Sequence, residues 1–379
     1  MMHILFVDDE FGDASSSASI AADALDTNAD YSVHRADFTD VIERLESRAP
    51  DLIVMDLQEE VEPGNARFPG ADSIAWVWEN RFCPIVVYSG FPDQLSDSYS
   101  AHPFVKVIKK GSRSVNQLEE AIVSLLPQIE SIQAAEDYMK KEFSIAMREV
   151  APYAFETFQD ATRRTETITR SGRRRFAARM DGPSGHGDKL VGWEQYLFPP
   201  VSDDLLLGDL IRVSEGSSDD PSSFRVVLTP SCDLSREGGR TPNVEVVLVA
   251  RCSPIKDALA RINKWSSDQR LDTESKRKKF QAKIETDVLT QGYSGSIMPL
   301  PCLEGKVPTM AADMRKLELI PIDQIGSGDS RYLRIASVDS PFRELISWAY
   351  MQNGCRPGLP GRDFSQWANE IVTNLEPGT

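Results

Sequence analysis

The sequence predicts an α/β fold: a doubly wound parallel five-stranded sheet, then a helical connector and a β-rich α+β domain at the C-terminal end. A length of 379 residues exceeds what one core ordinarily supports, which favours several domains. In the first third, continuous apolar runs alternate with helical patterns, as in parallel sheets covered on both faces. The C-terminal half instead has short β-branched runs separated by Gly, Ser, Asp and Pro turns.

Four apolar runs and one further predicted strand make up the sheet of a first domain that covers residues 1–127. The runs lie at residues 3–7, 52–55, 84–88 and 104–108, and the further strand lies at residues 31–34. Helical patterns at residues 15–25 and 38–48 separate the first three strands, and apolar residues recur at helical spacing from Val115 until Pro127. In such sheets the ligand site lies beyond the carboxyl ends of the strands.

Polar side chains stand at that end of four strands. They are Asp8 and Asp9 after the first strand, Asp56 after the third, Ser89 after the fourth, and Lys109 and Lys110 after the fifth. A single acid of this kind is ordinarily a solvated loop residue. The ordered set on successive strand ends is what predicts a site.

The chemistry of this set indicates phosphoryl transfer. Asp8, Asp9 and Asp56 supply the hard oxygen ligands that Mg²⁺ prefers. The metal would offset repulsion between the Asp56 carboxylate and an incoming phosphoryl group, so that Asp56 can act as the nucleophile. Lys110 and Ser89 would then bind phosphoryl oxygens.

Residues 1–127, a third of the chain, resemble a response-regulator receiver domain of two-component systems. The resemblance is carried by residues 4–10 with the acidic pair, 52–57 with Asp56, 87–90 with Ser89, 107–111 with the lysine, and by Gly70. It implies that Asp56 is the phosphoacceptor and that a sensor histidine kinase is the partner. Lys109 remains an alternative, although Lys110 fits the family spacing better. Val107 stands where the family carries an aromatic switch residue.

The middle of the chain is predicted to be a helical connector, residues 128–165, and a basic, Gly-rich linker, residues 166–190. Pro152 should kink or break the connector. The connector or the receiver could form a homodimer, or the helix could pack only against its own chain. The basic stretch, expected to be exposed and mobile, contains Arg163, Arg164, Arg170, Arg173, Arg174, Arg175 and Arg179. The net charge of −16 favours a solvated or intramolecular role for these arginines over DNA binding.

Residues 191–379 are predicted to form the β-rich α+β output domain. Strands are expected at residues 205–213, 224–229, 244–250, 297–300, 314–320 and 332–335, and helices at 255–261, 275–283, from 340 and at 364–372. Cys232 and Asp233 follow a predicted strand, and His186 could approach them in space. A buried cysteine at a turn, with Asp233 as an Asx-type cap, is the simpler interpretation. No P-loop or dinucleotide-binding motif occurs.

Two hypotheses about function follow. The first is a response regulator, phosphorylated on Asp56, whose C-terminal domain binds a protein partner or which buffers phosphate beside other receivers. The second is a receiver-gated effector whose C-terminal half is an enzyme or binds DNA. With no long apolar segment and no signal-peptide pattern at Met1, the sequence predicts a cytoplasmic protein that does not associate with a membrane.

Overall fold

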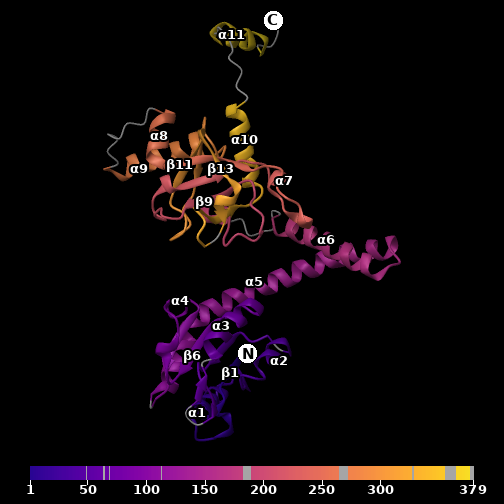
Figure 1. Ribbon diagram of the computed structural model, residues 1–379, viewed down its shortest axis with the longest axis vertical. Coiled ribbons are helices and arrows are strands. Elements are labelled where there is room, and N and C mark those ends of the chain that lie inside the picture. Colours follow the sequence, from indigo (N-terminus) through magenta and orange to yellow (C-terminus); the bar gives the residue numbers. More distant parts are fainter. Residues whose placement is uncertain are drawn as a thin grey trace. The chain divides into compact units, whose positions relative to one another are not determined.

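A computed structural model describes residues 1–47, 49–62, 65–67, 69–111, 113–181, 189–263, 272–326, 328–354 and 364–375. The chain divides into two compact units, Met1–Gly187 and Asp188–Thr379 (Figure 1). The boundary between them falls inside the predicted basic linker.

The first unit contains a five-stranded sheet in which every neighbouring pair is parallel. From edge to edge its strands are β2 (Tyr31–Ala36), β1 (Met2–Val7), β3 (Leu52–Met55), β6 (Ile85–Ser89) and β7 (Val105–Lys109). These are the five predicted strands, so this part of the fold prediction is confirmed.

Two apolar clusters cover the two faces of this sheet. Ile4 and Phe6 of β1 pack with α1 (Ser17–Asp26) and the start of α5 (Ser114–Thr157). Leu5 and Val7 pack with α2 (Val41–Ser47) and α3 (Pro69–Asn80). Because alternate strand residues enter different cores, both sets must be apolar, which explains the unbroken apolar runs of the sequence.

Two short strands follow Asp56. They are β4 (Glu59–Glu62) and β5 (Asn65–Arg67), which pair antiparallel. Helix α3 follows, and Gly70 is its second residue. The short α4 (Asp97–Ser100) precedes β7.

The helix predicted up to Pro127 continues past it, and Pro152, where a kink or a break was predicted, does not break it. Both prolines lie inside α5, which is a single helix of 44 residues. A proline removes one helical hydrogen bond. Tertiary packing on either side offsets that cost, because Leu125 and Ile129 are buried around Pro127 and Ala154 is buried beside Pro152.

The basic stretch is helical, which corrects the prediction of a mobile linker for residues 166–180. Helix α6 (Ala161–Met180) begins where the Asp160 side chain accepts a hydrogen bond from Arg163 N. It folds back along α5 as a hairpin (Figure 1), and Gly172 is buried where an added Cβ would lie 2.9 Å from the Met147 sulfur. Because Gly172 has no side chain, α5 and α6 can approach each other closely at this point.

The second unit is built on an eight-stranded, mainly antiparallel sheet. Its strands are β8 (Tyr196–Leu197), β9 (Asp209–Val213), β10 (Phe224–Val227), β11 (Val246–Pro254), β12 (Ile297–Leu300), β13 (Met310–Pro321), β14 (Ile325–Gly326) and β15 (Tyr332–Val338). The order is β12-β13-β11-β10-β9-β15-β14, with β8 on β15. The described helices are α7 (Ser231–Leu234), α8 (Ile255–Asn263), α9 (Glu274–Ile284), α10 (Phe342–Gly354) and α11 (Phe364–Leu375). An α+β character was predicted for this half.

Candidate functional site

Backbone hydrogen bonds extend the sheet one residue past the strands and so align the polar side chains. Asp8 N donates to Ala36 O at 3.0 Å, and Asp56 N donates to Val7 O at 3.0 Å. Lys110 N donates to Ser89 O at 2.9 Å. Each side chain is therefore fixed at the carboxyl edge by the same ladder that orders the strands.

Three carboxylates meet at this edge. One oxygen from each of Asp8, Asp9 and Asp56 lies within 4.8 Å of the others, a spacing that suits ligands of one metal ion. Asp8 is fully buried, Asp56 is 5% exposed and Asp9 is half-buried. The predicted grouping of these acids is therefore present in the structure.

Lys110 is the lysine that enters the cluster. Its Nζ lies 2.7 Å from Asp56 Oδ2, 2.9 Å from Asp8 Oδ2 and 3.3 Å from Glu10 Oε2. Lys109, the alternative, is the last residue of β7 and is exposed. The geometry thus selects Lys110, and it adds Glu10, which sequence reasoning did not single out.

Burial and neighbouring charges shift the pKa values of Asp8 and Lys110 in opposite directions. Burial raises the pKa of Asp8 to about 6, despite the lowering effect of Lys110. Burial alone would lower the pKa of Lys110, but the charges of Asp8 and Asp56 and the hydrogen bond to Asp56 raise it overall. The lysine is therefore held as a cation between two carboxylates.

The donor set fits a small divalent cation. Asp56 Oδ1 accepts hydrogen bonds from Leu57 N at 2.6 Å and Gln58 N at 3.3 Å, which fixes its orientation. Asp8 Oδ2 is buried, and among the described residues it accepts no well-directed hydrogen bond, since its contact with Lys110 is an ion pair without that geometry. Such an oxygen retains capacity for a metal, and carboxylate oxygens are the ligands that hard divalent cations prefer.

Ser89 and its neighbour Tyr88 close the site on the β6 side. Ser89 is fully buried, and its Oγ accepts a hydrogen bond from Phe91 N at 3.2 Å. The Tyr88 ring lies 6.0 Å from Lys110 Nζ, and its hydroxyl hydrogen-bonds to Ser114 Oγ at 2.7 Å. Tyr88 carried no recognisable signal in the sequence, because it reads as one more apolar residue of a strand.

The second candidate group is only partly described. Cys232 and Asp233 lie on α7 just after β10, and His186 lies outside the described residues. Cys232 is exposed, which corrects the expectation of a buried cysteine. Asp233 Oδ1 accepts a hydrogen bond from the Asn243 side chain at 3.3 Å, so it ties α7 to a loop rather than capping its own turn.

The neighbouring hydroxyls of this segment also serve the backbone. Thr229 Oγ1 accepts from Leu248 N at 2.8 Å, and Ser231 Oγ accepts from Leu207 N at 3.0 Å. These contacts position a loop. They provide no base or proton donor for a thiol nucleophile.

Several arginines of α6 are engaged within the hairpin. Arg179 Nη2 lies 2.6 Å from Glu142 Oε2, and Glu142 is nearly buried on α5. Arg175 pairs with Glu149, and the guanidinium of Arg164 lies 4.5 Å from the centroid of the Phe155 ring. This part of the basic stretch therefore contributes to α5–α6 packing, in agreement with the intramolecular role favoured from the sequence.

Comparisons with known proteins do not assign the chain to a family. No family model matches it, and no curated protein is similar to a significant degree. Among the helices of the described segments, none combines the length and the apolar character needed to cross a membrane. What the structure itself provides is an N-terminal five-stranded parallel sheet with an acidic cluster and a lysine at its carboxyl edge.

Proposed function

We propose that residues 1–127 are a receiver domain and that a sensor histidine kinase phosphorylates Asp56, as in two-component response regulators. One observation carries this proposal. Lys110 Nζ contacts both Asp8 and Asp56 at the carboxyl ends of β1, β3 and β7. A largely buried cation between two carboxylates is suited to replacing one contact with a phosphoryl oxygen as negative charge enters the site.

In the proposed reaction, an Asp56 carboxylate oxygen attacks phosphorus and displaces the histidine nitrogen of the kinase. One O–P bond forms, one P–N bond breaks, and the product is an aspartyl phosphate. Leu57 N holds the other Asp56 oxygen, so the nucleophile is oriented before the donor arrives. Lys110 would neutralise one phosphoryl oxygen, and Ser89 would donate its hydroxyl to another.

Mg²⁺ is the cofactor proposed for this site. Asp8, Asp9 and Asp56 would hold it, and when bound it supplies charge neutralisation that lets a carboxylate approach a phosphoryl group. The Lys110 ammonium occupies the same two carboxylates, so cation binding requires Lys110 to share or release them.

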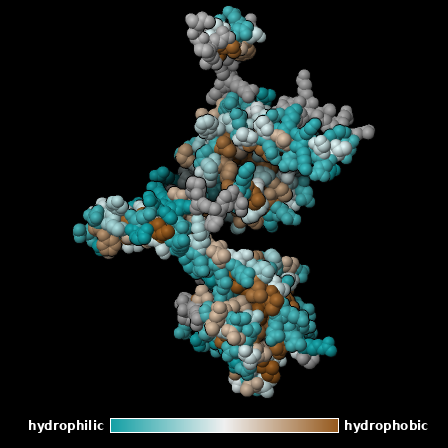
Figure 2. Space-filling view, turned by 180° about the vertical axis from the view of Figure 1, so that it is seen from behind, coloured by the Kyte–Doolittle hydropathy of each residue, from teal (hydrophilic) through white to brown (hydrophobic). Residues whose placement is uncertain are grey.

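The proposed output is noncatalytic: binding of a protein partner, or buffering of phosphate beside other receivers. Helix α5 runs without interruption from the receiver core into the α5–α6 hairpin. Phe143, Tyr153 and Phe155 of this hairpin expose about half or more of their side chains. They suit contact with a partner or a second copy, on a surface that Figure 2 shows to be otherwise largely hydrophilic.

Labelling with radioactive acetyl phosphate in the presence of Mg²⁺ tests the proposal. The full chain should incorporate an acid-stable, base-labile label, and Asp56→Asn should abolish it. Asp137→Asn is a matched control, because Asp137 is 82% exposed on α5. Equal labelling of the wild type and Asp56→Asn would refute the assignment of Asp56.

A further inference from the structure

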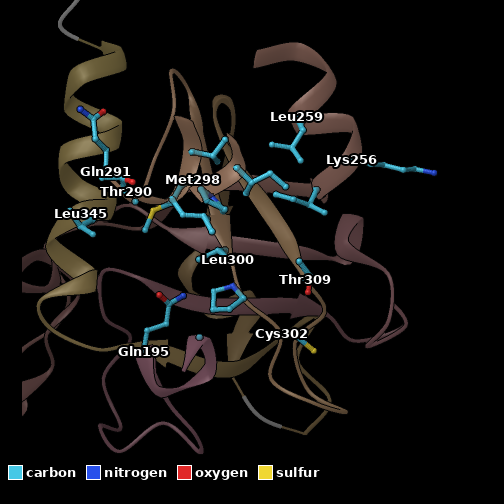
Figure 3. Close-up of a pocket in the computed structure, with 18 of the residues that line it drawn as sticks. Gln195, Lys256, Leu259, Thr290, Gln291, Met298, Leu300, Cys302, Thr309 and Leu345 are labelled. Carbon is cyan, nitrogen blue, oxygen red and sulfur yellow. The ribbon is translucent and has the colours of Figure 1, made fainter. Parts of the chain in front are cut away.

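A large apolar groove opens in the second unit. Its volume is about 1300 Å³, and its walls come from α8, the end of α9, β12 and α10. Figure 3 shows Leu259 on α8 and Leu345 on α10 on either side of the space, with Met298 and Leu300 between them. Lys256, although it lies at the rim, extends away from the groove.

The size and lining of the groove suit a row of large side chains. Sites for single small molecules usually measure about 300–1,000 Å³, and this groove is larger. An amphipathic helix that lays several apolar residues into a groove is a recurrent mode of recognition. The groove therefore fits a helix better than one compact ligand.

Helix α11 of the same chain presents the matching surface. Its apolar residues are spaced three and four apart, so they form one stripe along the helix. Phe364, Trp367, Ile371 and Val372 are each at least half exposed. A twelve-residue helix with such a stripe has little intrinsic stability in water, and burial of the stripe would stabilise it.

The chain length between groove and helix permits this contact. Nine residues, 355–363, separate the end of α10 from the start of α11. Fully extended, nine residues span at most about 30 Å. Leu345 lies nine residues before the end of α10, which corresponds to about 14 Å along that helix. The connection is therefore long enough for α11 to return along α10 to the groove.

The geometry points to α11 as the occupant of this groove, bound within its own chain through Phe364, Trp367 and Ile371. A short tether gives an effective concentration in the millimolar range, which favours this intramolecular contact over the same contact between two copies. The inference goes beyond the proposed receiver function and does not depend on phosphorylation of Asp56.

Paramagnetic broadening in the full chain tests the inference. Cys302 lines the groove and is exposed, so a nitroxide label can be attached there after Cys232→Ser and Cys355→Ser. The reporter is the Trp367 indole N–H signal, assigned with Trp367→Phe. We expect strong broadening of this signal that disappears when ascorbate reduces the nitroxide. A Trp367 signal that the label does not broaden would overturn the inference.

Two variants and one mixed sample separate the possible occupants. Leu289 lines the groove and is half exposed, so the Leu289→Asp chain should still fold and should show at least twofold less broadening. Leu319 is an exposed leucine outside the lining, so Leu319→Asp should leave the broadening unchanged. Equal broadening in these two variants would contradict binding in the groove. A mixture of spin-labelled ¹⁴N chains with unlabelled ¹⁵N chains should show no broadening, and broadening in that mixture would assign the contact to a second copy instead.

Discussion

Tyr88 Oη and Ser114 Oγ lie 2.7 Å apart, and their hydrogen bond joins β6 to the first residue of α5. Ser114 Oγ also donates to Gly111 O at 2.7 Å, so the Tyr88 hydroxyl is the donor in the pair. Both side chains are buried. The Tyr88 ring lies beside Lys110, so this bond links the surroundings of the acidic cluster to the helix that leaves the sheet.

The two partners of this bond should respond unequally to substitution. Ser114→Ala leaves a buried phenolic hydroxyl without an acceptor and should cost about 1–3 kcal/mol of folding free energy. Tyr88→Phe should cost about 1 kcal/mol or less, because Ser114 still donates to Gly111. Calorimetry of the full chain measures the loss of folding free energy in each variant. The relevant unfolding transition is the one that Mg²⁺ shifts to higher temperature, because it belongs to the unit that binds the metal. Equal costs for both variants would argue against the assigned donor.

Replacement of Lys110 should strengthen Mg²⁺ binding. Lys110→Met removes a cation that contacts two proposed metal ligands, Asp8 and Asp56. Like charges 4 Å apart repel by ~1 kcal/mol even at the dielectric constant of water, so affinity at pH 8 should rise at least about fivefold. Isothermal titration calorimetry measures the affinity, and Lys109→Met is the matched control because Lys109 is exposed. Unchanged affinity in Lys110→Met would place the metal elsewhere.

Mg²⁺ affinity should fall as the pH falls through 6. Burial raises the pKa of Asp8 to about 6 in the metal-free protein, so below that pH the carboxyl is protonated and must lose its proton before it binds a metal. The ionised fraction then changes from roughly nine-tenths at pH 7 to one-tenth at pH 5, which predicts a loss of about tenfold in affinity. Isothermal titration calorimetry with Mg²⁺ at pH 7 and at pH 5 measures this loss of affinity. Equal affinities at the two pH values would show that Asp8 is not a ligand.

The cysteines should divide into two reactivity classes. Burial raises the pKa of Cys83 and Cys252 to about 12, so at pH 8 only about one thiol in ten thousand is ionised. Cys232 and Cys302 are exposed and should react with iodoacetamide within minutes. Peptide mass spectrometry should find Cys83 and Cys252 modified only after denaturation. Modification of Cys83 or Cys252 in the folded protein would contradict the burial of these two side chains in the cores of the two units.

The sheet and the acidic cluster were predictable from sequence because local patterns encode them. Strands buried on both faces give unbroken apolar runs, and the residue that follows each run lies at the carboxyl edge. This reasoning placed Asp8, Asp9, Asp56 and Ser89 at that edge, where the structure has them. It could not choose between Lys109 and Lys110, because only the direction of each side chain decides which one meets the carboxylates.

The features that sequence reasoning missed depend on contacts between distant residues. The propensity of Pro152 to break a helix was overridden by packing of α5 against α6, which no local window shows. Tyr88 and Ser114 are separated by 26 positions. The groove of the second unit combines residues from Gly192 to Leu345, so its existence requires the finished fold.

Chemical trapping of the phosphorylated residue shows whether Asp56 carries the phosphoryl group. Borohydride reduces an aspartyl phosphate to homoserine, and peptide mass spectrometry then identifies the position that carried it. After incubation of the full chain with acetyl phosphate and Mg²⁺, we expect homoserine at position 56 and none when the metal is removed with EDTA. Homoserine at another aspartate, or at no position under conditions in which a known receiver domain is converted, would contradict phosphorylation of Asp56.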